Sequence, residues 1–139
     1  MKKIKKWLII SIIFLSILTF FAIYFRPIPI VIYSESTVVL VRRFNEETSE
    51  LESVTDLVDL EQIVEILSHY TTVRSFRNPF PTLVANIQWE IGLRRRSSGP
   101  YWIVLGYDNV LYRSANQNVF HRIQNAESLI YEINALFEF

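Results

Sequence analysis

The chain has 139 residues and no cysteine, which excludes a disulfide framework, a lipid-modified N-terminal cysteine and a cysteine nucleophile. Its formal net charge of zero hides an asymmetry, because residues 1–26 contain four Lys and one Arg without an acid, whereas residues 27–139 contain nine Arg, 14 acids and no Lys. The acidic balance of the second part argues against a nucleic-acid partner.

The first predicted element is an apolar helix over residues 7–25, "WLIISIIFLSILTFFAIYF", which contains no charged residue. A helix of this length extends about 28 Å, close to the hydrocarbon thickness of a bilayer, and we expect it to cross the membrane once. Large residues from Phe20 to Phe25 follow where a signal-peptide cleavage site needs small ones, which favours an uncleaved signal-anchor. Cleavage near Ser34 or Ser36 is the alternative.

The charges on either side of this span predict its orientation. Four lysines lie in the basic segment of residues 1–6, and only Arg26 follows the span closely. By the positive-inside rule, the N-terminus is expected in the cytoplasm and residues 37–139 are expected outside the cell membrane. The two prolines of "RPIPIVIYSES", residues 26–36, favour an extended, solvated spacer that lifts the following domain off the bilayer.

The exported part begins with a predicted β-hairpin and a helix. Residues 37–44, "TVVLVRRF", are largely β-branched, and "LESV" at 51–54 can return beside them after a polar turn. Apolar residues at helical spacing predict a helix over about residues 57–69. Asp59, with Gln62 three positions later, suits a capping box at its start.

Strands and a second helix complete the chain. Alternating or β-branched residues predict four strands, at residues 71–76, 83–95, 101–107 and 110–114. Asp108-Asn109 suits a two-residue turn between the last two of them. Asn125 is the predicted N-cap of the closing helix, "NAESLIYEINALF".

These elements predict an α+β fold, in which an N-terminal transmembrane helix precedes a small two-layer domain with an antiparallel sheet and two helices on one sheet face. The sheet side of the predicted core consists of Trp89, Ile91, Leu93, Ile103, Leu105, Tyr107 and Tyr112. The helix side consists of Leu60, Ile63, Val64, Leu67, Leu129, Ile130, Ile133 and Leu136.

The stretch "RRRSSGPYW", residues 94–102, allows the hairpin register to be predicted. A three-residue loop at 97–99 sets Leu93 opposite Ile103 and makes one face apolar, whereas a four-residue loop would set Arg94 opposite Ile103. In the preferred register the opposite face carries Trp and Arg side chains among aliphatic ones, which are types enriched at interfaces. The predicted partner-binding residues on this face are Arg94, Trp102, Val104, Leu111 and Arg113.

The three arginines themselves have two interpretations. They either keep the hairpin end soluble or contact an anionic wall polymer or lipid headgroup. Because Arg95 points to one face and its two neighbours to the other, the triplet is not expected to form a single patch of three charges.

Residues suited to catalysis or metal binding are sparse in the exported part. The absence of lysine there excludes a Ser/Lys nucleophile, and His69 and His121 have no metal-site spacing. Glu90 and Asp108 are the acids of the central sheet region, and we assign Glu90 to the outer face and Asp108 to the turn. We therefore expect neither an enzyme nor a cofactor or metal site.

The succession of "VTDLVDLEQIVEIL", "YWIVLGYDNVLYRS" and a closing helix resembles small exported or membrane-anchored domains of unknown function in Gram-positive bacteria. The resemblance implies an α+β fold and a surface location, and it carries over no site residue. The expected function is a membrane-anchored binding or regulatory module that docks on an envelope protein or polymer. An immunity-type protein against a secreted toxin and an envelope hydrolase are the alternatives.

Overall fold

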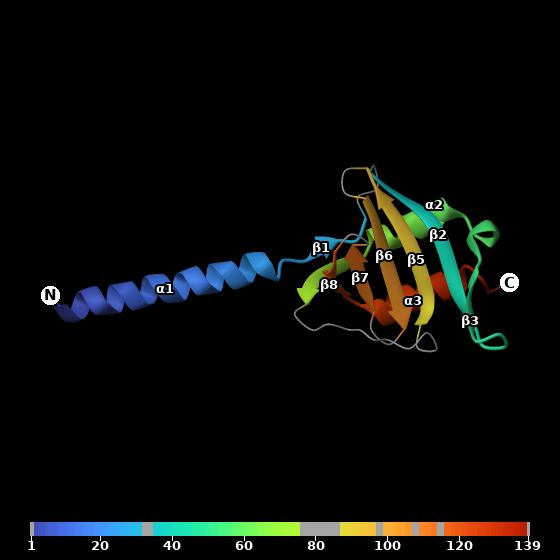
Figure 1. The fold of residues 1–139 in the computed structure, drawn as a ribbon. Helices are drawn as coiled ribbons and strands as arrows, with labels where there is room; N and C mark the ends of the chain where they lie inside the picture. Colours follow the sequence, from blue (N-terminus) through green and yellow to red (C-terminus); the bar gives the residue numbers. More distant parts are fainter. Residues whose placement is uncertain are drawn as a thin grey trace.

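The computed structural model describes residues 2–31, 35–75, 87–96, 99–106, 109–113 and 116–138. Helix α1, Lys2–Tyr24, projects away from a domain that contains the remaining elements (Figure 1). Residues Lys3–Tyr24 form a helix long and apolar enough to cross a membrane, with a mean hydropathy of 2.5 and no part buried in the domain. The predicted apolar helix and the α+β class are confirmed.

The domain contains one curled antiparallel sheet of eight described strands, in the order β1-β4-β8-β7-β6-β5-β2-β3. Their bounds are Ile28–Pro29 for β1, Ser36–Asn45 for β2, Glu50–Ser53 for β3, Thr71–Ser75 for β4, Ile87–Arg95 for β5, Gly99–Gly106 for β6, Val110–Arg113 for β7 and Asn116–Ile123 for β8. The predicted hairpin of residues 37–44 and 51–54 is the β2–β3 pair. A short 3₁₀-helix, η1, covers Thr55–Leu57.

Helices α2, Leu60–Ser68, and α3, Ala126–Ala135, lie together behind the sheet (Figure 1). Their buried side chains join one face of the sheet in the hydrophobic core, as predicted. Two polar contacts fix this packing: the Trp89 indole N–H donates to Asn134 at 2.9 Å, and the Tyr70 hydroxyl donates to Glu132 at 2.8 Å. Burial, together with the Glu132 carboxylate, raises the pKa of Tyr70 to about 12.

The helix starts differ in detail from the capping predictions. The Asp59 side chain caps α2 by accepting a hydrogen bond from the Glu61 backbone N–H at 2.9 Å. The predicted capping box instead involves Gln62, one position later. Asn125 precedes α3 as predicted, but it makes no side-chain capping bond and instead has a left-handed backbone, with φ 53°. Asn tolerates this conformation better than most residues, so Asn125 turns the chain from β8 into α3.

The segment after α1 is the main departure from the predicted organisation. Residues 28 and 29 form strand β1 against β4, and the Ile30 N–H donates to the Tyr70 carbonyl at 3.1 Å. Ile30 and Val31 are both buried in the hydrophobic core. The prediction of a solvated spacer over residues 26–36 is therefore wrong at Ile30 and Val31, and only a few residues separate α1 from the domain.

The β5–β6 register keeps the predicted faces but not the predicted pairs. Ile91 pairs with Ile103 and Leu93 with Tyr101, whereas we expected Leu93 opposite Ile103. The difference is two positions, and side chains alternate with a period of two along a strand. Trp89, Ile91, Leu93, Ile103 and Leu105 therefore all remain in the core, as predicted.

The β6–β7 register differs from the predicted one and exchanges the faces of β7. Val110 pairs with Val104 rather than with Tyr107, a shift of three positions that exchanges the faces of β7. Leu111 consequently lies in the hydrophobic core, and the prediction that it faces outward is wrong. Tyr112 pairs with Trp102 and Phe120 on the outer face, so its assignment to the core is wrong as well. Tyr107 and Asp108 lie outside the described residues.

Candidate functional site

The face of the sheet opposite the two helices is organised in cross-strand rows. One row runs Leu40, Gly92, Trp102, Tyr112 and Phe120 across β2, β5, β6, β7 and β8. The next row runs Arg42, Glu90, Val104, Val110 and Arg122. On the other side of the first row, Thr37, Arg94 and Pro100 pair in sequence.

Trp102 is held over a glycine in the middle of this face. A Cβ at Gly92 would lie 3.3 Å from both the Trp102 ring and the Leu40 Cβ, so the ring occupies the space that a side chain would otherwise fill. Trp102 remains partly exposed, as does Leu40. Gly92 therefore leaves room for the Trp102 ring beside Leu40.

Several side chains of this face toward β7 and β8 are buried. Val104, Val110 and Phe120 are buried although they do not belong to the main core, and the Phe120 and Tyr112 rings contact each other at 6.1 Å. Accessible side chains of this face lie on β2, β5 and β6, and Arg122 on β8 is exposed as well. We call this surface the outer-face strip; it consists of Thr37, Val39, Leu40, Arg94, Pro100 and Trp102.

The five predicted binding residues do not all meet on this strip. Arg94 and Trp102 belong to it, Val104 is buried beside it, and Leu111 lies in the core on the other face. Arg113 pairs with Tyr101, which itself pairs with Leu93 of the core, so the register does not place Arg113 on the outer-face strip and its prediction is wrong. The sequence did not predict that Thr37, Val39 and Leu40 on β2 belong to this surface. The bulge between Val38 and Leu40 reverses the alternation of side chains along that strand.

The three arginines at 94–96 do not form one patch, as predicted from the alternation of side chains along the strand. Arg95 donates to the carbonyl of Ile30, lies 3.4 Å from that of Pro29, and stacks over the Tyr101 ring at 4.5 Å. The backbone N–H of Arg96 donates to the Glu35 carbonyl at 3.1 Å. Arg95 thus holds the segment between α1 and β2 against the domain, and Arg94 is left on the outer-face strip.

The residues considered for catalysis lie apart from one another. Glu90 pairs with Arg42 at 3.2 Å on the outer face, while His69 follows the end of α2 and is exposed. His121 pairs with Leu111 on the core face, where burial, and then the charges of Arg74 and Arg95, lower its pKa. Among the described residues, no group of three His, Cys, Asp or Glu side chains is placed to hold a metal ion.

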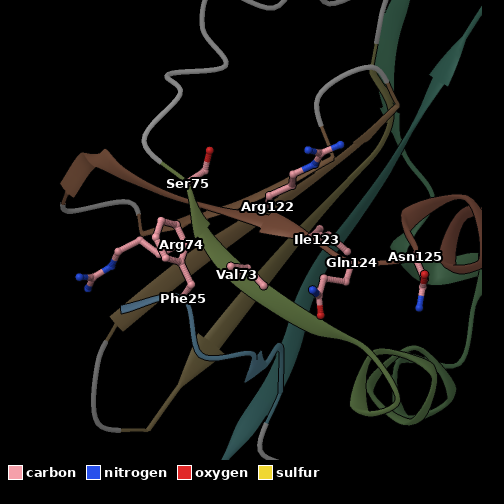
Figure 2. A pocket seen from close by; sticks show the side chains of 8 residues that line it. All are labelled: Phe25, Val73, Arg74, Ser75, Arg122, Ile123, Gln124 and Asn125. Carbon is pink, nitrogen blue, oxygen red and sulfur yellow. The ribbon is translucent and has the colours of Figure 1, made fainter. Parts of the chain in front are cut away.

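A pocket of about 650 Å³ lies where α1 joins the domain (Figure 2). Phe25 contributes its rim from the end of α1, and the strands β4 and β8 contribute Arg74 and Arg122. The Arg74 guanidinium lies 4.6 Å from the centre of the Tyr24 ring, so the helix end and β4 are in direct contact. No acidic side chain is among the described residues that line the pocket.

No family model, curated protein or solved structure matches this chain.

Proposed function

We propose that this protein is a single-pass, membrane-anchored binding module of the cell envelope, with its N-terminus in the cytoplasm and its domain outside. The observation that carries the proposal is the combination of an apolar helix that is not buried in the domain with a folded domain joined directly to its end. Four lysines before the span and one arginine after it support the orientation.

The short connection defines where such a module would act. Phe25 to Pro27 are the residues between α1 and β1, and the Arg74–Tyr24 contact joins β4 to the helix end. Because Ile30 is buried in the core, the domain has little freedom to move away from the bilayer. A partner would therefore be bound at the membrane surface rather than at a distance from it.

The outer-face strip is the surface we assign to that partner, an envelope protein or polymer. It combines a partly exposed Trp with an exposed Arg and with Val39, which is 44% exposed. Tryptophan and arginine are enriched among residues that dominate binding energies. Exposed aliphatic groups beside them would be removed from water by a partner.

A crosslinking experiment tests this assignment, since the chain contains no native cysteine. Thr37→Cys places a single thiol on the strip, and a photoreactive maleimide attached to it should give a discrete crosslinked species in native membranes. Adding Arg94→Glu reverses a charge at the position paired with Thr37 and should abolish the crosslinked species. Because Arg94 is exposed, this substitution should change the melting temperature of the protein by no more than about 1–2 °C.

The matched control is Thr48→Cys in the exposed turn between β2 and β3, which should give no such species. Equal crosslinking from both positions would show random collision and would count against a specific surface. Absence of any product from Thr37→Cys in native membranes would remove the strip as the binding site.

A further inference from the structure

His121 lies on the core face of β8, and its Nδ1 atom is buried without a hydrogen-bond partner among the described residues. A neutral imidazole tolerates such a position better than a charged one, because both ring nitrogens of a protonated histidine are donors that need acceptors. An unpaired charge removed from water is also far more costly than a neutral polar group. The structure therefore favours a neutral His121.

The charged groups that act on His121 are both basic. Arg74 pairs with it across β4 and β8, and Arg95 on β5 is the second charge. The residue paired with it on β7 is Leu111, which does not titrate, and on β6 the Tyr101 ring lies against the Arg95 guanidinium at 4.5 Å. No carboxylate is among the described groups that act on His121. A proton on this histidine would therefore meet two positive charges and no counter-ion in the described part of the chain.

The same two arginines hold the end of α1 and the segment after it on the domain. The Arg74 guanidinium lies 4.6 Å from the centre of the Tyr24 ring. Arg95 donates to the carbonyl of Ile30 and lies 3.4 Å from that of Pro29. Strand β4, which carries Arg74, also pairs with β1. A charge on the histidine would thus act on both contacts that join the helix end and β1 to the domain.

The titration of His121 has a definite direction. Burial, and then the charges of Arg74 and Arg95, lower its pKa from the ordinary value of 6.5. If residues 28–31 left the domain, water would enter and Arg95 would be free to move, so His121 would take up a proton near its ordinary pKa. Below pH 6.5 the detached state therefore binds more protons than the attached state. Attachment is complete above that pH and weakens as the pH falls toward the lowered pKa.

We propose that His121 is a pH sensor for the attachment of residues 28–31: acidification charges it beside Arg74 and Arg95 and releases this segment from the domain. The domain would then gain reach from the end of α1. This consequence at the membrane rests on the anchoring of the proposed function, whereas the release itself does not.

Hydrogen exchange of the full chain in detergent micelles tests the release, with rates corrected for the intrinsic pH dependence of exchange. The measurement compares about pH 7.5 with about pH 5.5, a window above the ordinary carboxylate pKa values of about 4. Protection of peptides covering residues 26–31 should fall several-fold at the lower pH. The fall should not exceed about tenfold, the limit for one proton taken up one pH unit below 6.5. Protection of α2 should stay nearly constant.

His121→Gln should abolish this fall, because its amide does not titrate. If circular dichroism shows that this variant does not fold, His121→Leu replaces it, since Leu111 already occupies the paired position. The matched control is His69→Gln, which removes the other histidine of the chain at an exposed position after α2. It should behave as the unsubstituted protein does. Arg74→Gln removes one of the two repelling charges and should give a smaller fall.

Three results would overturn the proposal. The first is equal protection of residues 26–31 at the two pH values in the unsubstituted protein. The second is an equal fall in the His121 variant, or its loss in His69→Gln. The third is an equal fall in α2, which would show unfolding of the whole domain rather than release of one segment.

Sodium carbonate washing of membranes tests the anchoring independently of this pH response. A chain released by the wash would contradict the anchored module and would leave the exchange result in micelles intact. A retained chain in which residues 26–31 exchange alike at the two pH values would contradict the pH sensor alone.

Discussion

Replacing Leu105 or Ile133 by alanine is expected to lower the free energy of unfolding by about 2–5 kcal/mol in each case. Both side chains are 0% exposed, Leu105 near the end of β6 and Ile133 on the face of α3 that packs against the sheet. Each substitution removes buried methyl groups and leaves a cavity that the close-packed layers refill only in part. Denaturant unfolding of the full chain in micelles, followed by tryptophan fluorescence, measures the loss.

The control for these variants is Leu57→Ala, because Leu57 is 70% exposed at the end of η1. It should change the free energy of unfolding by less than about 0.5 kcal/mol. If Leu105→Ala and Ile133→Ala were as harmless as this control, the arrangement of two helices on one face of the sheet would be wrong.

Ile30→Asp is expected to be the most damaging single substitution, with a loss of about 4 kcal/mol or more. Ile30 is 0% exposed, and its neighbours include the backbone of Tyr70, with which it forms a hydrogen bond. A carboxylate at this position must either lose its hydration or force the segment out of the core. Thermal and denaturant unfolding of the full chain report the effect.

Ile28→Asp is the matched control, two residues earlier in the chain but at a side chain that is 43% exposed. It should be nearly neutral. If Ile30→Asp were as well tolerated as Ile28→Asp, residues 28–31 would behave as the solvated spacer that the sequence predicts, and the domain would not be held at the membrane surface.

Hydrophobic periodicity was sufficient to predict the layers of this fold. The alternation from Ile87 to Leu93 identifies the buried face of β5, and the helical spacing of Ile63, Val64 and Leu67 identifies that of α2. These patterns reflect only which side chains are buried. A register error of two positions does not change which face of the sheet a side chain lies on.

Strands β1 and β8 were not predicted, because pairing with neighbouring strands stabilises them and their composition is not typical of strands. Strand β8, "NQNVFHRI", is mostly polar, yet it pairs with β4 and β7 on its two sides. Strand β1 contains Pro29, a residue that disfavours strands except at edges, and β1 is indeed an edge strand. Neither pairing leaves a periodic signal in the sequence.

The binding surface was predicted only in part, because it depends on the turn that follows β6. A two-residue turn at Asp108-Asn109 would place Leu111 outward, but the observed pairing of Val104 with Val110 leaves residues 105–109 between the paired positions. The Asn109 side chain accepts from the Gly106 N–H at 2.9 Å, and both residues have positive φ. Asn-containing turns are compatible with several loop lengths, and an odd shift in length exchanges the faces of the following strand.

Single-cysteine labelling in cells provides the most direct test of the membrane-anchored module, because the native chain has no cysteine to interfere. Thr48→Cys places a thiol in the exposed β2–β3 turn of the domain, and Lys3→Cys places one before the apolar span. A membrane-impermeant maleimide applied to intact cells should label Thr48→Cys but not Lys3→Cys, and both should be labelled after permeabilisation. Labelling of Lys3→Cys but not of Thr48→Cys in intact cells, or recovery of the chain in the soluble fraction, would contradict an anchored domain on the outer surface.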